Sequence, residues 1–281
     1  MKYTFTQFKQ DFPNDDTCLD YIFNQKYGKT YQCTACHKTG FYRVKKRKCY
    51  ACAWCGQQIH PTAGTIFHKS STKLTNWFYA LFLASQSKNG VSAKALERQL
   101  GVTYKCAWRI ARKIRELMSQ EGGDMLSGTI EVDETYIGGY KRGGQGGKGK
   151  VPVLGIVERK GEIRTKKIEG RHTHEILNEI RKNVEKDTLI MSDQFGVYKK
   201  TKRLGYKHLA VNHWKKEFVR GNVHTNTIEG FWSQLKRSID GTYHSISPKY
   251  LQAYLDEFAF RYNLRASDVH PFHVLLSSLV R

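Results

Sequence analysis

Hydrophobic residues recur every three or four positions along the chain from about residue 75 to residue 118. This spacing places them on one side of a helix. Glycine turns interrupt the pattern after Asn89 and after Leu100, so we expect three helices, over residues 75–88, 92–100 and 103–118. The second and third of these, joined by a tight glycine turn, predict a helix-turn-helix.

The third predicted helix has an apolar side and a basic side. Its apolar stripe contains Cys106, Ala107, Ile110, Ile114 and Leu117. The opposite side carries the basic residues Lys105, Arg109, Arg112 and Lys113. A basic recognition helix that contacts DNA fits this distribution, and a helical hairpin with a solvated basic face is the alternative.

After a glycine-containing linker at residues 121–123 the pattern changes to mixed strands and helices. Residues 129–137 alternate, with Ile130 and Val132 on one face and Glu131, Asp133 and Thr135 on the other, as expected for a strand. The later elements are predicted as strands over 151–158, 163–168, 188–193 and 208–211 and helices over 173–186, 226–240 and 249–263. This order is the topology of a ribonuclease H-like α/β domain.

Three domains follow from these changes of pattern. We expect an N-terminal region over residues 1–70, a helix-turn-helix domain over 71–122 and the ribonuclease H-like domain over 123–281.

The chain is strongly basic, with 47 Lys and Arg against 25 Asp and Glu, a net charge of +22 over 281 residues. A hydrophobic fraction of 40% excludes a disordered polycation, so a folded protein carries the charge. Nucleic acid is the expected partner, because basic side chains that neutralise phosphates release counterions. No apolar run reaches 18 residues and residues 1–12 lack a signal-peptide pattern. We therefore expect no membrane partner and a cytoplasmic, nucleoid-associated protein.

Four of the seven cysteines have the spacing of a zinc ribbon. Cys33 and Cys36 are separated by two residues, and 15 residues later Cys52 and Cys55 repeat that spacing, followed by Gly56. Two such turns place four sulfurs around one structural Zn²⁺. Cys49 and Cys52 are also correctly spaced, so Cys49 is an alternative ligand, and unligated cysteines are the other alternative.

Three carboxylates stand out by position: Asp133 within a strand, Asp193 at a strand end and Glu229 on a helix. In the predicted topology the two aspartates lie side by side, and a helix packed on the sheet presents the glutamate. Converging carboxylates repel each other unless a hard cation binds them, which favours Mg²⁺ or Mn²⁺ and phosphodiester chemistry.

Each acid also has a structural alternative. Asp193 could end its strand with a turn, and Asp133 could face solvent, as could Glu131 and Glu134. Glu229 could belong to a capping box that begins at Asn226.

The chain resembles bacterial insertion-sequence transposases that carry an N-terminal zinc ribbon before a DDE integrase-type catalytic domain. The similarity rests on the four ribbon cysteines and on the segments 62–67, 132–139, 153–158, 192–193 and 224–232. It implies that Asp133, Asp193 and Glu229 are the metal-binding triad of a transposase that cleaves and transfers DNA strands at its element's terminal inverted repeats. His224 and Asn226 match the same motif, and their roles stay open.

The resemblance also implies a homo-oligomer on paired DNA ends. The glycine-rich stretch 138–150 and the cluster Lys199, Lys200, Lys202 and Arg203 are either contacts to DNA phosphates or solvated loops. Two other functions remain open at this point: a zinc-ribbon and helix-turn-helix regulator without catalytic activity, and a nuclease that cleaves DNA without strand transfer.

Overall fold

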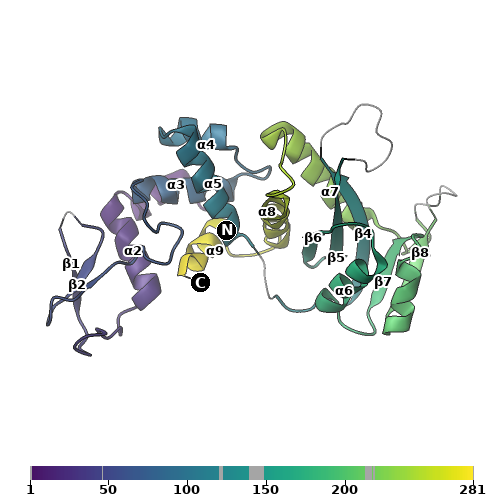
Figure 1. Cartoon of the computed structure of the whole chain (residues 1–281), viewed down its shortest axis with the longest axis horizontal. Coiled ribbons are helices and arrows are strands. Elements are labelled where there is room, and N and C mark those ends of the chain that lie inside the picture. Colours follow the sequence, from purple (N-terminus) through teal and green to yellow (C-terminus); the bar gives the residue numbers. More distant parts are fainter. Residues whose placement is uncertain are drawn as a thin grey trace. The chain divides into compact units, whose positions relative to one another are not determined.

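The computed structural model describes residues 2–280 apart from residue 46, segments 120–122, 139–148 and 213–216, and residue 218. It forms two compact units, shown in Figure 1: residues 1–117 together with 268–281, and residues 118–267. The first predicted domain and residues 71–117 of the second therefore lie within one unit. The C-terminal residues, expected in the catalytic domain, belong to that first unit as well.

The first unit begins with two helices and a small antiparallel sheet of strand order β1-β2-β3. Its elements are α1 (Phe5–Asp11), α2 (Asp15–Tyr27), β1 (Phe41–Arg43), β2 (Tyr50–Cys52) and β3 (Gln58–Ile59). The middle strand is buried, and Tyr50 stacks on Phe23 of α2 with ring centroids 4.0 Å apart. This contact joins the sheet to the helix beside it.

Three helices follow at the predicted places, as α3 (Leu74–Gln86), α4 (Ala93–Leu100) and α5 (Tyr104–Leu117). Ser92 caps α4 by accepting a hydrogen bond from the Ala95 N–H at 3.2 Å. Gly101 adopts the left-handed conformation (φ 62°) that ends α4 and opens the turn to α5. The predicted helix-turn-helix layout is thus confirmed.

The chain returns to the first unit at its end, through α9 (Pro271–Ser277) and the short η4 (Ser278–Val280). Phe272 of α9 is fully buried and stacks on Tyr3 with ring centroids 5.1 Å apart. Its ring also contacts Phe8 and Phe82. An aromatic core therefore joins the two ends of the chain.

The second unit contains a five-stranded mixed sheet of order β6-β5-β4-β7-β8 (Figure 1). β4, β5 and β6 are antiparallel neighbours, while β7 and β8 run parallel to β4. The strands are β4 (Thr129–Ile137), β5 (Val151–Glu158), β6 (Ile163–Lys167), β7 (Leu189–Asp193) and β8 (Lys207–Val211). The remaining elements are α6 (Thr173–Asn183), η1 (Tyr198–Leu204), α7 (Asn226–Ser238), η3 (Ile239–Tyr243) and α8 (Leu251–Asn263). The mixed α/β architecture confirms the predicted fold class.

Both faces of this sheet are covered. The even-numbered residues Ile130 and Val132 pack with α6 and η1 in one core cluster. The odd-numbered face packs against α7 and α8 in a second cluster. The face of β4 expected to be polar is therefore covered by a helix. No helix among the described residues is both long and apolar enough to cross a membrane.

Gly155 of β5 lets α7 approach the sheet closely. A Cβ at this position would lie 2.5 Å from Trp232 and 2.7 Å from Ile228, both buried side chains of α7. These separations are far below van der Waals contact, so any larger residue forces the helix away from the strand. Gly155 pairs directly with Asp133 across the sheet.

We expect Gly155→Ala to lower the free energy of unfolding by about 1–3 kcal/mol, because the added methyl group overpacks the interface under α7. Urea denaturation measures this. Gly230→Ala is the matched control on the same helix, where a Cβ meets nothing within 4 Å. It should leave stability unchanged or raise it by up to about 1 kcal/mol. Equal stability of Gly155→Ala and the natural protein would contradict the close approach.

Candidate functional site

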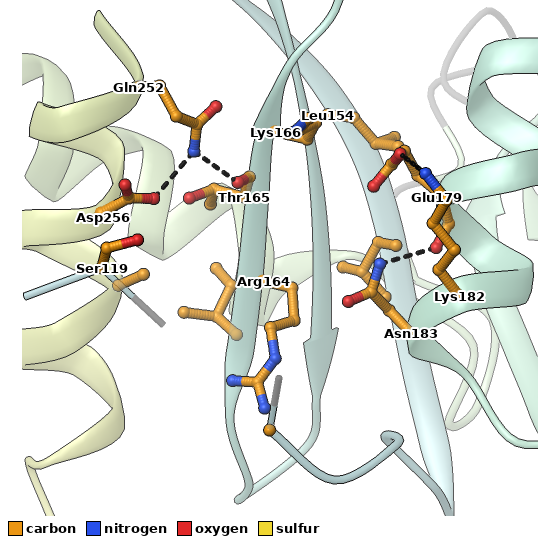
Figure 2. A pocket seen from close by; sticks show the side chains of 14 residues that line it. Ser119, Leu154, Arg164, Thr165, Lys166, Glu179, Lys182, Asn183, Gln252 and Asp256 are labelled. Atoms are coloured by element: carbon orange, nitrogen blue, oxygen red, sulfur yellow. Dashed lines mark hydrogen bonds and ion pairs between the residues drawn. The ribbon is translucent and has the colours of Figure 1, made fainter. Parts of the chain in front are cut away.

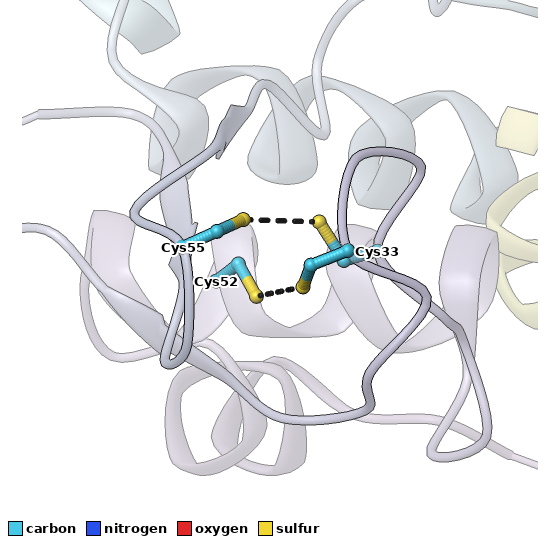
Figure 3. A group of neighbouring side chains, drawn as sticks. Cys33, Cys52 and Cys55 are labelled. Carbon is cyan, nitrogen blue, oxygen red and sulfur yellow. Dashed lines mark hydrogen bonds between the residues drawn. The ribbon is translucent and has the colours of Figure 1, made fainter.

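The four predicted ribbon cysteines lie together in the structure (Figure 3). Their Sγ atoms all lie within 4.8 Å of one another, with Cys33 and Cys55 at 3.6 Å and Cys36 and Cys52 at 3.6 Å. Hydrogen bonding from the Cys55 backbone N–H lowers the pKa of Cys52 to about 6. A thiolate is the form that binds a metal, so this donor set fits Zn²⁺.

Cys49 lies outside this group. Its side chain is buried, and its Sγ points to Gln58 Oε1 at 3.8 Å. The structure therefore does not support Cys49 as an alternative zinc ligand.

Asp133 and Asp193 lie at the same level on two neighbouring parallel strands. The paired positions Thr129–Leu189, Ile130–Ile190 and Glu131–Met191 keep a constant offset of 60 residues. The same offset, extended two residues beyond the last paired position, brings Asp133 level with Asp193, and the charge of Asp193 acts on Asp133. Both are half-buried, and Asp193 also accepts a hydrogen bond at Oδ1 from the Phe195 N–H at 2.9 Å. Asp193 therefore supports the turn after its strand as well.

The surroundings of Asp133 disfavour its charged form. Burial is the main cause, and the charges of Glu134 and Asp193 add to it, raising the pKa of Asp133 to about 7. Trp232 of α7 donates a hydrogen bond from Nε1 to Asp133 Oδ2 at 3.1 Å. The alternative in which Asp133 faces solvent is therefore wrong.

Glu229 lies in the first turn of α7 and is exposed. Its Oε1 accepts a hydrogen bond from Thr225 Oγ1 at 2.6 Å. The N-cap of α7 is Thr225 and makes no side-chain cap bond, so the capping box starting at Asn226 is wrong. The sulfur atoms of the four cysteines gather within 4.8 Å of one another, and among the described residues the three carboxylates form no comparable group. The described residues thus do not bring the three acids together as one such cluster.

The sequence interpretation missed Glu131, which is completely buried between β4 and α7. It accepts hydrogen bonds from Arg159, from the Thr227 hydroxyl and from the backbone N–H groups of Thr227 and Ile228. The expectation that Glu131 could face solvent is wrong, because α7 covers that face. The available signal was its alternation with Asp133, which puts both acids on one face of the strand.

The predicted basic residues lie on the surface. Lys105, Arg109 and Arg112 are exposed and Lys113 is half-buried on α5. Glu116 pairs with Lys113 at 2.6 Å and with Arg112 at 3.4 Å. The exposed cluster Lys199, Lys200, Lys202 and Arg203 occupies η1, which follows Asp193 along the chain. Of the glycine-rich stretch 138–150, residues 139–148 lie outside the described residues.

A cavity of about 360 Å³ opens beside β5 and β6 (Figure 2). Gln252 of α8 spans part of its wall, donating to the Thr165 carbonyl at 3.0 Å and to Asp256 at 2.8 Å. None of the three candidate catalytic acids lines this cavity.

Two domains of this chain match known families. Residues 125–263 match the ISXO2-like transposase domain, and residues 13–58 match the transposase zinc-ribbon domain. The chain therefore belongs to the insertion-sequence transposases that carry a zinc ribbon before a ribonuclease H-like DDE domain.

A relative in Halobacterium salinarum, described as an uncharacterized protein in transposable element ISH50, is 26% identical over 242 residues. The alignment covers 79% of this chain and 80% of that protein. A chain in the structure of a simian T-cell lymphotropic virus intasome with the PP2A regulatory subunit B56 gamma is 14% identical, with a TM-score of 0.33. That alignment covers 63% of this chain and 66% of that one, and at this TM-score it supports no argument.

The position of Cys49 predicts which substitutions cost the protein its zinc. Cys55→Ala should lose most of the bound zinc, because it removes one of the four clustered thiols. Cys49→Ala is the matched control in the same zinc-ribbon segment and should keep its zinc. Atomic emission on purified proteins measures the metal. Loss of zinc from Cys49→Ala with retention in Cys55→Ala would reverse the ligand assignment.

The pKa of Asp133 predicts how stability depends on pH in protein without added Mg²⁺ or Mn²⁺. Between the unfolded pKa near 4 and the folded pKa of about 7, the folded state binds the extra proton, so stability falls as pH rises. Asp133→Asn removes this dependence. From pH 5 to pH 8 the free energy of unfolding of the natural protein should fall by about 2–3 kcal/mol relative to that of Asp133→Asn. Urea denaturation at each pH measures this difference. Parallel pH profiles would contradict the raised pKa.

Proposed function

We propose that this transposase cleaves DNA at the terminal inverted repeats of its own element and transfers the cut strand to target DNA. Asp133, Asp193 and Glu229 are the catalytic residues in this proposal. The observation that carries it is the strand register that puts Asp133 beside Asp193, in surroundings that raise the pKa of Asp133. Two half-buried acids whose charges repel each other cost stability, and such a cost is typical of a functional site.

The donor set of this site fits a hard divalent cation. Both aspartates offer oxygen ligands, and oxygen-rich sites prefer Mg²⁺ or Mn²⁺. Asp133 and Asp193 would hold the cation, and the hydrogen bond from Trp232 to Oδ2 would orient the Asp133 carboxylate. When bound, the cation supplies neutralising charge and polarises the phosphate oxygens at the reacting phosphorus.

The proposed reaction has two in-line displacements at phosphorus. In the first, a water oxygen bonds to phosphorus at the element end, and the bond from phosphorus to the 3′-oxygen breaks, which leaves a free 3′-OH. In the second, that 3′-oxygen bonds to a target phosphorus, the hydroxyl proton leaves, and the target strand is cut. Each step breaks one P–O bond for each bond formed, so no covalent link between protein and DNA is needed.

Two surfaces of the first unit are assigned to DNA recognition. The exposed basic side of α5, with Lys105, Arg109, Arg112 and Lys113, is the proposed recognition face of the helix-turn-helix. The ribbon, with structural Zn²⁺ held by Cys33, Cys36, Cys52 and Cys55, carries further basic residues between its strands. Paired DNA ends require a homo-oligomer, and the protein is expected to associate with the nucleoid.

The exposed basic residues of η1 are proposed to contact flanking or target phosphates, because η1 begins five residues after Asp193. A cation close to the catalytic acids attracts the polyanionic substrate to an otherwise repulsive site. The stretch 138–150 has the same proposed role.

The test uses labelled DNA carrying the element end, with Mg²⁺, and compares the natural protein with Asp193→Asn. Both should bind the DNA equally, and only the natural protein should nick it and form joined products. The substitution should lower cleavage by at least about 100-fold, because it removes a charged cation ligand. Equal binding without nicking by either protein would instead favour a regulator, and nicking without joined products would favour a nuclease.

A further inference from the structure

The side chain of Glu131 makes a dense set of contacts where α7 meets β4. Its Oε1 accepts hydrogen bonds from Arg159 Nε at 2.6 Å and from Thr227 Oγ1 at 2.9 Å. Its Oε2 accepts from the Thr227 N–H at 2.8 Å and from the Ile228 N–H at 3.1 Å. A completely buried carboxylate is tolerated only with such partners, and here both oxygens have two.

Glu131 caps the second and third N–H groups of α7 from a distant strand. The first N–H groups of a helix have no partner within the helix, and the N-cap Thr225 makes no side-chain cap bond. The N–H groups of Thr227 and Ile228 instead reach a carboxylate of β4, where the helix dipole also favours negative charge. The start of α7 is thereby attached to one residue of the central strand.

Arg159 extends this attachment to the turn that precedes α7. It donates from NH1 to the Asn222 carbonyl at 2.7 Å and from NH2 to the His224 carbonyl at 2.8 Å. Its NH2 also lies 2.9 Å from His224 Nδ1. A guanidinium can only donate, so this ring nitrogen accepts and His224 carries its proton on Nε2. His224 therefore belongs to the attachment of the turn.

We propose that Glu131 and Arg159 are positioning residues for Glu229. This inference rests on the proposed function, in which Glu229 is the third metal-binding acid. β4 holds α7 at two points, through Glu131 at Thr227 and Ile228 and through Asp133 at Trp232. Glu229 lies between these points, so the two attachments set the rotation and shift of the helix that carries it.

The alternative is that Glu131 and Arg159 only stabilise the fold. Buried ion pairs are weak evidence for net stability, since apolar replacements often serve as well. A positioning role and a purely stabilising role predict different results. If Glu131 positions Glu229, substituting Glu131 should weaken metal binding and cleavage only while Glu229 is present. A double-mutant cycle measures that dependence.

The experiment compares Glu131→Gln and Arg159→Lys in the full chain with its zinc retained. Glutamine must place an NH₂ group against at least one of the donors that Glu131 now accepts from. Lysine keeps the charge beside Glu131 and loses the fork that reaches Asn222 and His224, so it serves if Glu131→Gln does not fold. Glu257→Gln is the matched control, because Glu257 is also buried and pairs with Arg261 at 2.8 Å.

Two readouts are used: Mn²⁺ affinity by electron paramagnetic resonance, and cleavage of labelled element ends. Glu131→Gln and Arg159→Lys should each weaken Mn²⁺ binding and cleavage by about 10–100-fold, the usual effect of residues that support metal ligands. Glu257→Gln should stay within about twofold of the natural protein in both. In a Glu229→Gln background, Glu131→Gln should cause no further loss.

Two results overturn the inference alone. The first is an additive loss in the double mutant Glu131→Gln, Glu229→Gln. The second is unchanged Mn²⁺ affinity and cleavage in Glu131→Gln and Arg159→Lys, while Glu229→Gln and Asp193→Asn abolish cleavage. If Glu229→Gln and Asp193→Asn themselves leave cleavage and Mn²⁺ binding unchanged, the proposed function fails and the inference fails with it. The behaviour of the Glu229 and Asp193 variants therefore separates the two failures.

Discussion

The buried contact between the Glu131 carboxylate and the start of α7 is the constraint on which the arrangement of the site depends. It attaches a helix to the strand that carries Asp133, and Gly155 on the next strand gives that helix room to lie close. Removing one partner of a buried charge pair typically costs about 3–5 kcal/mol. This energy is a large part of the total stability of a domain, so α7 does not detach from β4 easily. A flexible loop could not hold a carboxylate as reproducibly as this helix can.

Charge is distributed unevenly around this attachment. The chain as a whole has a net charge of +22, yet Asp133 lies among other acids in the sheet. Burial raises its pKa, and the charges of Glu134 and Asp193 raise it further. The basic surplus lies on exposed elements such as α5 and η1. This separation suits a protein of the transposase family, because exposed cations attract a polyanion such as DNA.

Local patterns predicted much of this structure. Alternation located β4 at its observed bounds, glycine turns separated α3, α4 and α5, and cysteine spacing identified the clustered thiols. The expected topology also placed β7 next to β4, which are the strands that carry Asp193 and Asp133. Long-range contacts were beyond these patterns: Glu131 caps a helix that begins 95 residues later, and α9 returns to pack on Tyr3. Such contacts depend on which faces meet in space, and periodicity records only that a face is apolar or polar.

The most direct measurement is the anomalous diffraction of Mn²⁺ in crystals of the full chain bound to a DNA end. The account predicts a peak bound by the carboxylates of Asp133 and Asp193, with Glu229 approaching it from α7 and Glu131 still bonded to Thr227 and Ile228. A peak elsewhere would contradict the account. So would a peak at the two aspartates to which Glu229 also binds while α7 is detached from Glu131.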